Sequence, residues 1–216
     1  MRQENVERAP AAYAKSTVVK CVSVLTNTVD FGMAIEDLSK MKAQVPKPIL
    51  RKDFILEEYQ VYEARAFGAD ALLLMANVLT RDEMRRLFEL SRGLGMDVLF
   101  EAHTREEIES IPEGAKLYGI NSRKFKASAQ TFTDSTKGAD LSVELDTFAL
   151  INHLPKHAIK IAESGVKPSK LPEVIQMGYD AVLVGTSLLK AVSGIESILN
   201  EFELAVTAKL STEVKV

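Results

Sequence analysis

Residues 48–75, PILRKDFILEEYQVYEARAFGADALLLM, contain one complete strand–helix–strand unit. Two apolar runs, Pro48–Phe54 and Ala69–Met75, have the length of β-strands, and the segment Glu57–Phe67 between them places apolar residues at helical spacing. Gly68 stands where the C-cap of that helix is expected. Nearly continuous apolar strands that alternate with helices are typical of a parallel sheet covered by helices.

The same alternation continues on both sides of this unit, from about residue 18 to the C-terminus. The pattern predicts further strands at Val18–Leu25, Asp97–Ala102, Lys116–Asn121, Ile159–Ser164 and Ala181–Val184. It predicts further helices at Asp30–Gln44, Arg81–Leu94, Arg105–Ile111, Leu145–Leu154, Pro168–Met177 and Gly194–Glu203. Residues 1–16 are expected to form an N-terminal helix, and residues 124–142 read as a long polar loop.

The length of the chain fits one barrel-sized domain. The sequence has 216 residues, whereas a closed barrel of eight strand–helix units needs roughly 250, with about 200 as the lower bound. Seven units are recognised, and the one that is not recognised would be the first. No linker divides the chain, so residues 1–216 are predicted to form a single α/β domain. We therefore predict a TIM (β/α)8-type barrel with seven recognisable strands.

Composition argues against several classes of protein. The 27 basic and 30 acidic residues leave a net charge of −3, which argues against binding to nucleic acid or to an anionic membrane. Cys21 is the single cysteine, which excludes an internal disulfide and a four-cysteine zinc site. We recognise neither a secretory signal nor an apolar run of the roughly 18 residues that span a membrane. We therefore expect a cytoplasmic protein.

Polar residues end four of the apolar strands: Lys52, Glu101, Asn121 and Glu163. Because side chains alternate between the two faces of a strand, each of them shares a face with the apolar residue or glycine two positions earlier. All four would therefore point into the interior at the carboxyl ends of the strands, where barrel enzymes keep their active sites. A lone buried charge costs several kcal/mol or more, so these side chains should pair with one another or bind a substrate.

Each of these residues taken alone is equally well explained as a charge on a solvated rim. Their shared parity and shared strand end favour one interior site. His103 lies on the same face of its strand as Glu101 and could contact a substrate, but the sequence favours a position on the rim of the barrel. Pro155 separates His153 from His157 and would break a helix between them, which argues against a metal pair.

The last two strands end in residues that suit an anion. Gly185, Thr186 and Ser187 follow the last strand, and Ser164 and Gly165 follow the one before it. Backbone N–H groups and hydroxyls in such turns bind phosphate, and the final two loops of barrels commonly do so. A helix cap explains a single turn of this kind equally well, but two neighbouring turns favour a phosphate site.

The motifs at these positions resemble indole-3-glycerol phosphate synthase, the tryptophan-pathway enzyme that closes the indole ring. Seven segments carry the resemblance in order from about Ala11 to Glu203: residues 23–26 (SVLT), 48–55 (PILRKDFI), 59–65 (YQVYEAR), 68–74 (GADALLL), 119–123 (GINSR), 162–165 (AESG) and 183–188 (LVGTSL). The combination of Arg-Lys-Asp-Phe-Ile, Gly-Ile-Asn-x-Arg and Glu-Ser-Gly is specific. The resemblance implies a barrel of the ribulose-phosphate-binding class.

The resemblance also implies a reaction: the decarboxylating ring closure of 1-(2-carboxyphenylamino)-1-deoxyribulose 5-phosphate to indole-3-glycerol phosphate. This is a lyase reaction on a phosphorylated small molecule, with no metal or organic cofactor. Lys52 would be the general acid at the substrate ketone, Glu101 would serve the later proton transfer, and Asn121 and Glu163 would orient the reacting groups. The remaining matched positions would bind substrate: Arg123 near its carboxylate; Leu25, Phe31, Phe54 and Leu73 around its aromatic ring; and Ser164, Gly165, Gly185 and Thr186 at the polar and phosphate end.

The sequence departs from the family at the first strand. There the family carries Glu-x-Lys followed by a Ser-Pro-Ser-Lys-Gly loop, and neither motif occurs here. Without that strand, Val18–Leu25 and Ala181–Val184 would be unpaired edges, so we expect a monomer or a weak homo-oligomer that forms through these edges. Two alternatives stay open: a non-catalytic or impaired phosphate-binding barrel derived from the family, and a true start upstream of Met1.

Overall fold

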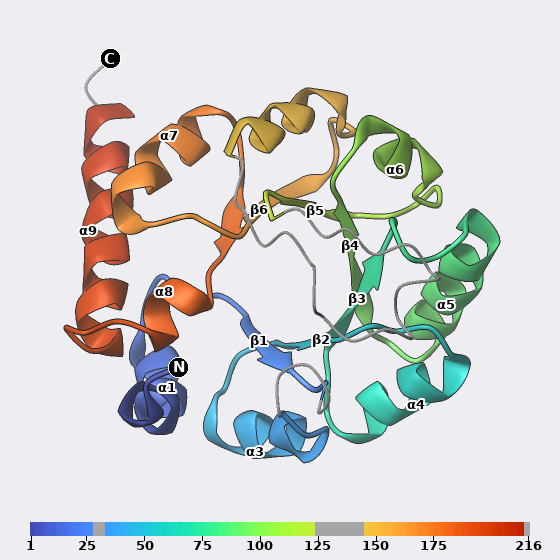
Figure 1. Cartoon of the computed structure of the whole chain (residues 1–216), viewed down its shortest axis with the longest axis horizontal. Helices are drawn as coiled ribbons and strands as arrows, with labels where there is room; N and C mark the ends of the chain where they lie inside the picture. Colours follow the sequence, from blue (N-terminus) through green and yellow to red (C-terminus); the bar gives the residue numbers. More distant parts are fainter. Residues whose placement is uncertain (28–32, 124–144, 214–216) are drawn as a thin grey trace, which may run out of the picture.

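The computed structural model describes residues 1–27, 33–123 and 145–213, so Phe31 and the loop predicted at 124–142 lie outside the described residues. Its sheet has seven strands in the order β1 to β7, and every neighbouring pair is parallel. The sheet curls into an open barrel (Figure 1). The predicted α/β barrel with seven strands is therefore confirmed. The strands are β1 (Val22–Leu25), β2 (Ile49–Lys52), β3 (Ala71–Met75), β4 (Asp97–Ala102), β5 (Leu117–Asn121), β6 (Ile159–Glu163) and β7 (Ala181–Leu183).

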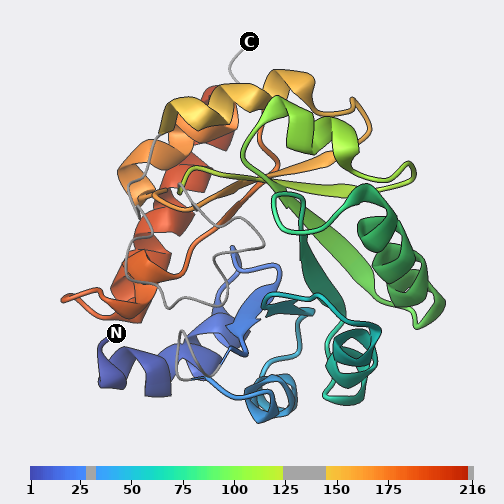
Figure 2. The same cartoon turned by 45° about the vertical axis from the view of Figure 1, so that its right-hand side comes forward.

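Helices surround the outer face of this curved sheet in both views (Figures 1 and 2). The α-helices are α1 (Gln3–Lys15), α3 (Glu36–Gln44), α4 (Glu58–Ala66), α5 (Arg81–Gly93), α6 (Arg105–Ser110), α7 (Leu171–Gln176), α8 (Thr186–Leu189) and α9 (Ile195–Glu213). Two segments form 3-10 helices, η1 (Leu145–His153) and η2 (Pro168–Lys170). Every strand from β1 to β6 is joined to the next through the helical layer, as parallel pairing requires.

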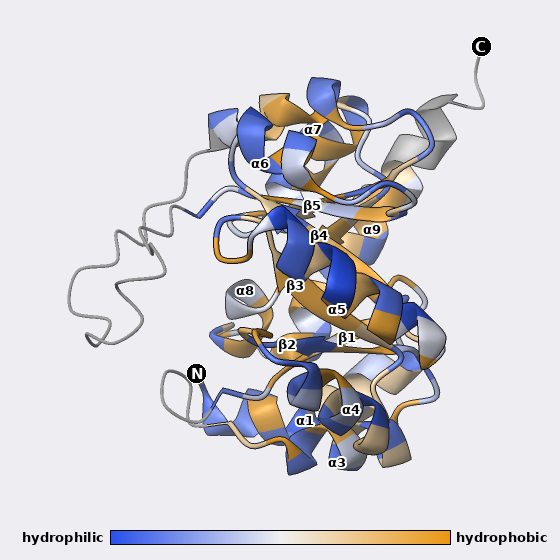
Figure 3. Ribbon diagram, turned by 90° about the vertical axis from the view of Figure 1, so that its right-hand side faces the viewer, coloured by the Kyte–Doolittle hydropathy of each residue, from blue (hydrophilic) through white to orange (hydrophobic). Residues whose placement is uncertain are grey.

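Alternation along the strands divides the core into two layers. Leu72 and Leu74 of β3 point outward into the main cluster beneath the helices, whereas Leu73 and Met75 belong to a cluster inside the barrel. All five residues of β3 are buried, so the strand is apolar on both faces. In Figure 3, the side of α5 that faces the viewer is mostly hydrophilic, and hydrophobic residues follow β3 and β4 behind it.

Helices α1, α8 and α9 gather on the side of the molecule between the last strand and β1 (Figure 1). Asn5 of α1 is fully buried, and its amide nitrogen donates hydrogen bonds to the carbonyl oxygens of Leu188, Leu189 and Ala191. These helices share a separate apolar cluster that includes Ala9, Ala12, Leu188, Ile195, Leu199 and Phe202. The N-terminal helix is thereby attached to the C-terminal end of the fold.

The edges of the sheet are β1 and β7, each of which pairs with a single strand in the described ranges. In those ranges, no helix is both long and apolar enough to cross a membrane.

Candidate active site

The interior of the barrel holds a lysine between two glutamates at the carboxyl ends of β2, β4 and β6. The ammonium Nζ of Lys52 donates to Oε2 of Glu101 at 2.7 Å and to Oε2 of Glu163 at 3.1 Å. The Lys52 side chain is 21% exposed, whereas the two glutamate side chains are 2% and 0% exposed. Because the strands are parallel and the three side chains point to the same face of the sheet, as predicted, the fold brings these residues together at the carboxyl ends of the strands. Lys52 is the most exposed of the three.

The three charges shift one another's pKa values. Burial would lower the pKa of Lys52, but the charges of Glu101 and Glu163 outweigh burial and hold that pKa above its ordinary value. Burial raises the pKa of Glu163 to about 7, a shift that the charge of Glu101 reinforces. Burial acts in the same direction on Glu101, but the positive charge of Lys52 outweighs it and lowers the pKa of Glu101 to about 2. Near neutral pH the site therefore combines an ammonium, a carboxylate and a carboxyl group that exchanges its proton.

Gly119 makes room for Glu163. Register pairs Asn121 of β5 with Glu163 of β6, and Gly119 lies two residues before Asn121 on the same face. A Cβ at position 119 would lie 1.9 Å from Oε1 of Glu163, so a side chain there would force the carboxyl group of Glu163 to move. The sequence alone indicated no role for Gly119, because the need for glycine comes from the register between β5 and β6.

Ser122 and Ser164 shape the turn after β6. The hydroxyl of Ser122 donates to the carbonyl oxygens of Glu163 and Ser164. Ser164 has a φ of 67°, an uncommon value for a residue with a side chain, and Gly165 follows with a φ of 70°. Strained backbone of this kind persists only where surrounding contacts hold it, and it is concentrated at functional sites.

The other predicted site residues lie around the same end of the barrel. Asn121 is half-buried, and its Oδ1 accepts a hydrogen bond from the backbone N–H of Arg123. Leu25 is the register partner of Lys52, and Phe54 packs with Leu73 in the inner apolar cluster. The structure thus brings Leu25, Phe54 and Leu73 to the barrel interior that holds Lys52, while Phe31 falls outside the described residues.

The predicted phosphate residues follow the last two strands. Gly165 comes after β6, Gly185 lies between β7 and α8, and Thr186 is the first residue of α8. All three residues are exposed. Because β6 and β7 are neighbours in the sheet, these two turns begin at adjacent strand ends.

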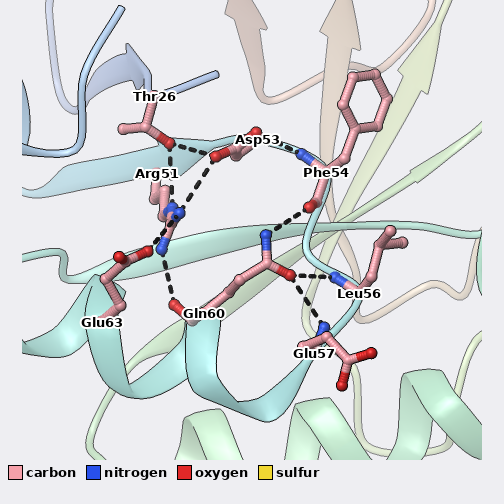
Figure 4. A network of polar contacts seen from close by, with 8 residues as sticks. All are labelled: Thr26, Arg51, Asp53, Phe54, Leu56, Glu57, Gln60 and Glu63. Carbon is pink, nitrogen blue, oxygen red and sulfur yellow. Dashed lines mark hydrogen bonds and ion pairs between the residues drawn. The ribbon is translucent and has the colours of Figure 1, made fainter. Parts of the chain in front are cut away.

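Arg51 supports the site from the opposite face of β2. Its guanidinium contacts the carboxylates of Asp53 and Glu63, the hydroxyl of Thr26 and the carbonyl oxygen of Gln60 (Figure 4). The Arg51 side chain is 4% exposed, so its charge requires these partners. Arg51 belongs to the motif Arg-Lys-Asp-Phe-Ile, but the sequence alone indicated no role for it. The available signal was a charged residue on the helix-facing side of an apolar strand.

His103 follows β4 by one residue. Its ring Nδ1 lies 3.4 Å from Glu107 Oε2, and Nε2 lies 3.7 Å from Glu101 Oε1. The same Glu107 oxygen accepts the backbone N–H of His103 at 2.6 Å. The sequence favoured a rim position, yet the ring is only 13% exposed and adds a second cationic group beside Glu101.

Across the described ranges, no cluster of three or more His, Cys, Asp or Glu side chains has the arrangement of a metal site.

Solved structures of other proteins share this architecture. The 3-hexulose-6-phosphate synthase from Salmonella typhimurium superposes with a TM-score of 0.73 at 13% identity, over 97% of this chain and 97% of that chain. A thiamine phosphate pyrophosphorylase from Pyrococcus furiosus superposes with a TM-score of 0.67 at 16% identity, over 96% of this chain and 92% of that chain. At such low identity the likeness concerns the fold alone, and it agrees with the predicted α/β barrel.

Comparison with the sequences of known proteins shows higher identity than these structures do. The chain is 42% identical over 171 residues to an indole-3-glycerol phosphate synthase of Streptomyces griseus, which covers 78% of this chain and 59% of the relative. It is 40% identical over 172 residues to the synthase of Kineococcus radiotolerans, which covers 78% of this chain and 58% of that relative. The chain thus spans somewhat under three fifths of the length of these curated relatives. The family model of indole-3-glycerol phosphate synthase matches residues 2–199, and the chain belongs to that family.

Proposed function

We propose that the chain catalyses the decarboxylating ring closure of 1-(2-carboxyphenylamino)-1-deoxyribulose 5-phosphate to indole-3-glycerol phosphate, in tryptophan biosynthesis. The proposal rests on family membership together with one observation, the ammonium of Lys52 held between Glu101 and Glu163. In this reaction a ring carbon bonds to the ketone carbon, carbon dioxide leaves, and the former ketone oxygen departs as water. It is a carbon–carbon lyase reaction.

Lys52 is the proton donor in this proposal. It is the most exposed of the three charged groups, so a substrate that enters the barrel meets its ammonium before it meets either carboxylate. Proton transfer from Lys52 to the ketone oxygen accompanies attack by the aromatic ring. Glu101 then accepts a proton as the ring regains its aromaticity, and Asn121 and Glu163 orient the reacting groups.

The substrate is oriented by the two ends of the site. The aromatic ring packs against Leu25, Phe54 and Leu73, with Phe31 as a further predicted wall residue, and Arg123 binds the carboxylate. The phosphate binds backbone N–H groups at Gly165 and Gly185 with the hydroxyls of Ser164 and Thr186. An anion is favoured at such turns because several backbone N–H dipoles converge there.

Turnover by the purified chain tests the proposal. Given the anilino-ribulose phosphate, the chain should produce an indole chromophore, and Lys52→Met should abolish it. Lys40→Met is the matched control, because Lys40 is an exposed residue of α3 paired with Asp37, and it should keep the parent rate. Equal rates for the parent chain and Lys52→Met would reject the role of Lys52.

The alternative of a non-catalytic phosphate-binding barrel predicts a different pattern. Indole-3-glycerol phosphate would then raise the melting temperature while no turnover occurs. The oligomeric state, a cytoplasmic location and independence from cofactors stay predictions of the sequence.

A further inference from the structure

His103 stands between two carboxylates at the edge of the site. Its Nε2 faces Oε1 of Glu101 at 3.7 Å, and its Nδ1 faces Oε2 of Glu107 at 3.4 Å. An imidazole with a carboxylate on each side is stabilised when both nitrogens carry protons, which is the cationic form. The ring is only 13% exposed, so water screens these contacts weakly.

The two glutamates of the site therefore experience unequal surroundings. Glu101 has Lys52 at 2.7 Å from one carboxylate oxygen, and Nε2 of His103, which forms no hydrogen bond in the described part of the chain, lies 3.7 Å from the other. Glu163 has Lys52 at Oε2 and shares a side-chain hydrogen bond with Glu101, and in the described part of the chain its Oε1 forms no hydrogen bond. That oxygen lies 1.9 Å from the position that a Cβ on Gly119 would take. The positive charges of Lys52 and of protonated His103 thus lie beside Glu101.

We propose that His103 is a positioning residue that, as an imidazolium, keeps Glu101 ionised and so assigns the exchangeable proton of the carboxyl pair to Glu163. The catalytic meaning of this assignment rests on the proposed function. With the proton on Glu163, Lys52 has one anionic neighbour instead of two, which makes its ammonium a better acid. After Lys52 gives its proton to the ketone oxygen, the neutral amine takes the proton of Glu163, which becomes a carboxylate, at 3.1 Å.

The charged groups that surround His103 agree with this assignment. Glu101 of β4, Glu107 of α6 and Glu163 of β6 face the ring, and Lys52 of β2 lies beyond Glu101. Burial would lower the pKa of His103, but the hydrogen bond to Glu107 and the charges of these carboxylates raise it above its ordinary value. The pKa values of about 2 for Glu101 and about 7 for Glu163 differ in the same sense.

Carboxyl titration of the full chain by NMR, with isotope-labelled glutamate, tests the proposal without requiring turnover. His103→Gln keeps a hydrogen-bonding side chain and removes the cation, so the proton of the pair should be held more tightly. The upper titration of the pair should move upward by about 1 pH unit. The control His157→Gln changes an exposed histidine that precedes β6, and it should leave the titration unchanged.

Glu107→Gln provides a second route to the same result. It keeps an acceptor for the backbone N–H of His103 while it lowers the pKa of the ring, so His103 loses its proton at lower pH. The upper titration should therefore rise in Glu107→Gln as well, but Glu107→Gln should add no further rise when His103→Gln is already present. If the chain is active, the pH profile of kcat/KM should move with the titration.

The proposal is overturned if His103→Gln leaves the upper titration in place, or if Glu107→Gln raises it equally with and without His103. Failure of the proposed function would appear separately, as absent turnover in a chain whose carboxyl titration still responds to His103→Gln.

Discussion

Gly119→Ala tests whether close approach between β5 and β6 positions the site. The new Cβ would lie 1.9 Å from Oε1 of Glu163 and 3.0 Å from its Cδ. Contacts below 3.0 Å do not occur for real Cβ atoms, so the carboxyl group must retreat by about 1 Å. Oε2 contacts Lys52 at 3.1 Å, and a retreat of that size takes the pair out of hydrogen-bond range.

Two magnitudes follow from this displacement. Overpacking of a close-packed interior costs about 1–3 kcal/mol, and a domain of this size loses about 2–4 °C of melting temperature per kcal/mol. A misplacement of about 1 Å near reacting atoms costs on the order of 100-fold in rate. We therefore expect a moderately less stable protein with a much larger loss of turnover.

Thermal unfolding and kcat measured on the same preparations check both magnitudes. Gly93→Ala is the matched control, because Gly93 ends α5 and a Cβ there meets no atom within 4 Å. That variant should keep the parent rate and gain up to about 1 kcal/mol of stability from helix propensity. A Gly119→Ala protein with parent-like kcat and melting temperature would refute the close-approach argument.

Three further variants probe the support of the site. Arg51→Met leaves the carboxylates of Asp53 and Glu63 without their cation and should cost about 3–5 kcal/mol in urea unfolding; a loss below about 1 kcal/mol would show that the network is not stabilising. Asn5→Ala removes the amide that donates to the carbonyl oxygen of Ala191 at 2.9 Å, and it should cost about 1–3 kcal/mol in the same experiment. The raised pKa of Glu163, about 7 against an ordinary 4.5, contributes stability that is complete below pH 4.5 and lost as the pH rises through about 7. Glu163→Gln should flatten the decline of stability between pH 4.5 and 7, and an unchanged decline would contradict the assignment of the proton to Glu163.

Strand alternation predicted the centre of the site. Apolar residues two positions before Lys52, Glu101 and Glu163 placed these side chains inside the barrel, and parallel connections placed them at one end. The strands begin and end within a few residues of their predicted bounds; the largest difference is at β1, which begins at Val22 rather than Val18. The local pattern of the sequence suffices to place these side chains, because the alternation of side chains along a strand and the direction of each strand both follow from nearby residues.

Contacts that depend on register or on competing hydrogen bonds were not predictable in the same way. The need for glycine at position 119 arises only when β5 and β6 pair with Asn121 beside Glu163. Apolar spacing also does not distinguish an α-helix from a 3-10 helix, so the helix predicted at Leu145–Leu154 is a 3-10 helix over Leu145–His153. The short helix α8 was missed, because four residues are too few to show a period.

A crystal structure of the chain with indole-3-glycerol phosphate tests the central claim most directly, because it reads the site whether or not the chain turns over. The account predicts the phosphate at the backbone of Gly165 and Gly185, the indole ring against Phe54 and Leu73, and the ammonium of Lys52 turned toward the ligand. A ligand bound elsewhere on the barrel, or no binding at millimolar concentration, would contradict it.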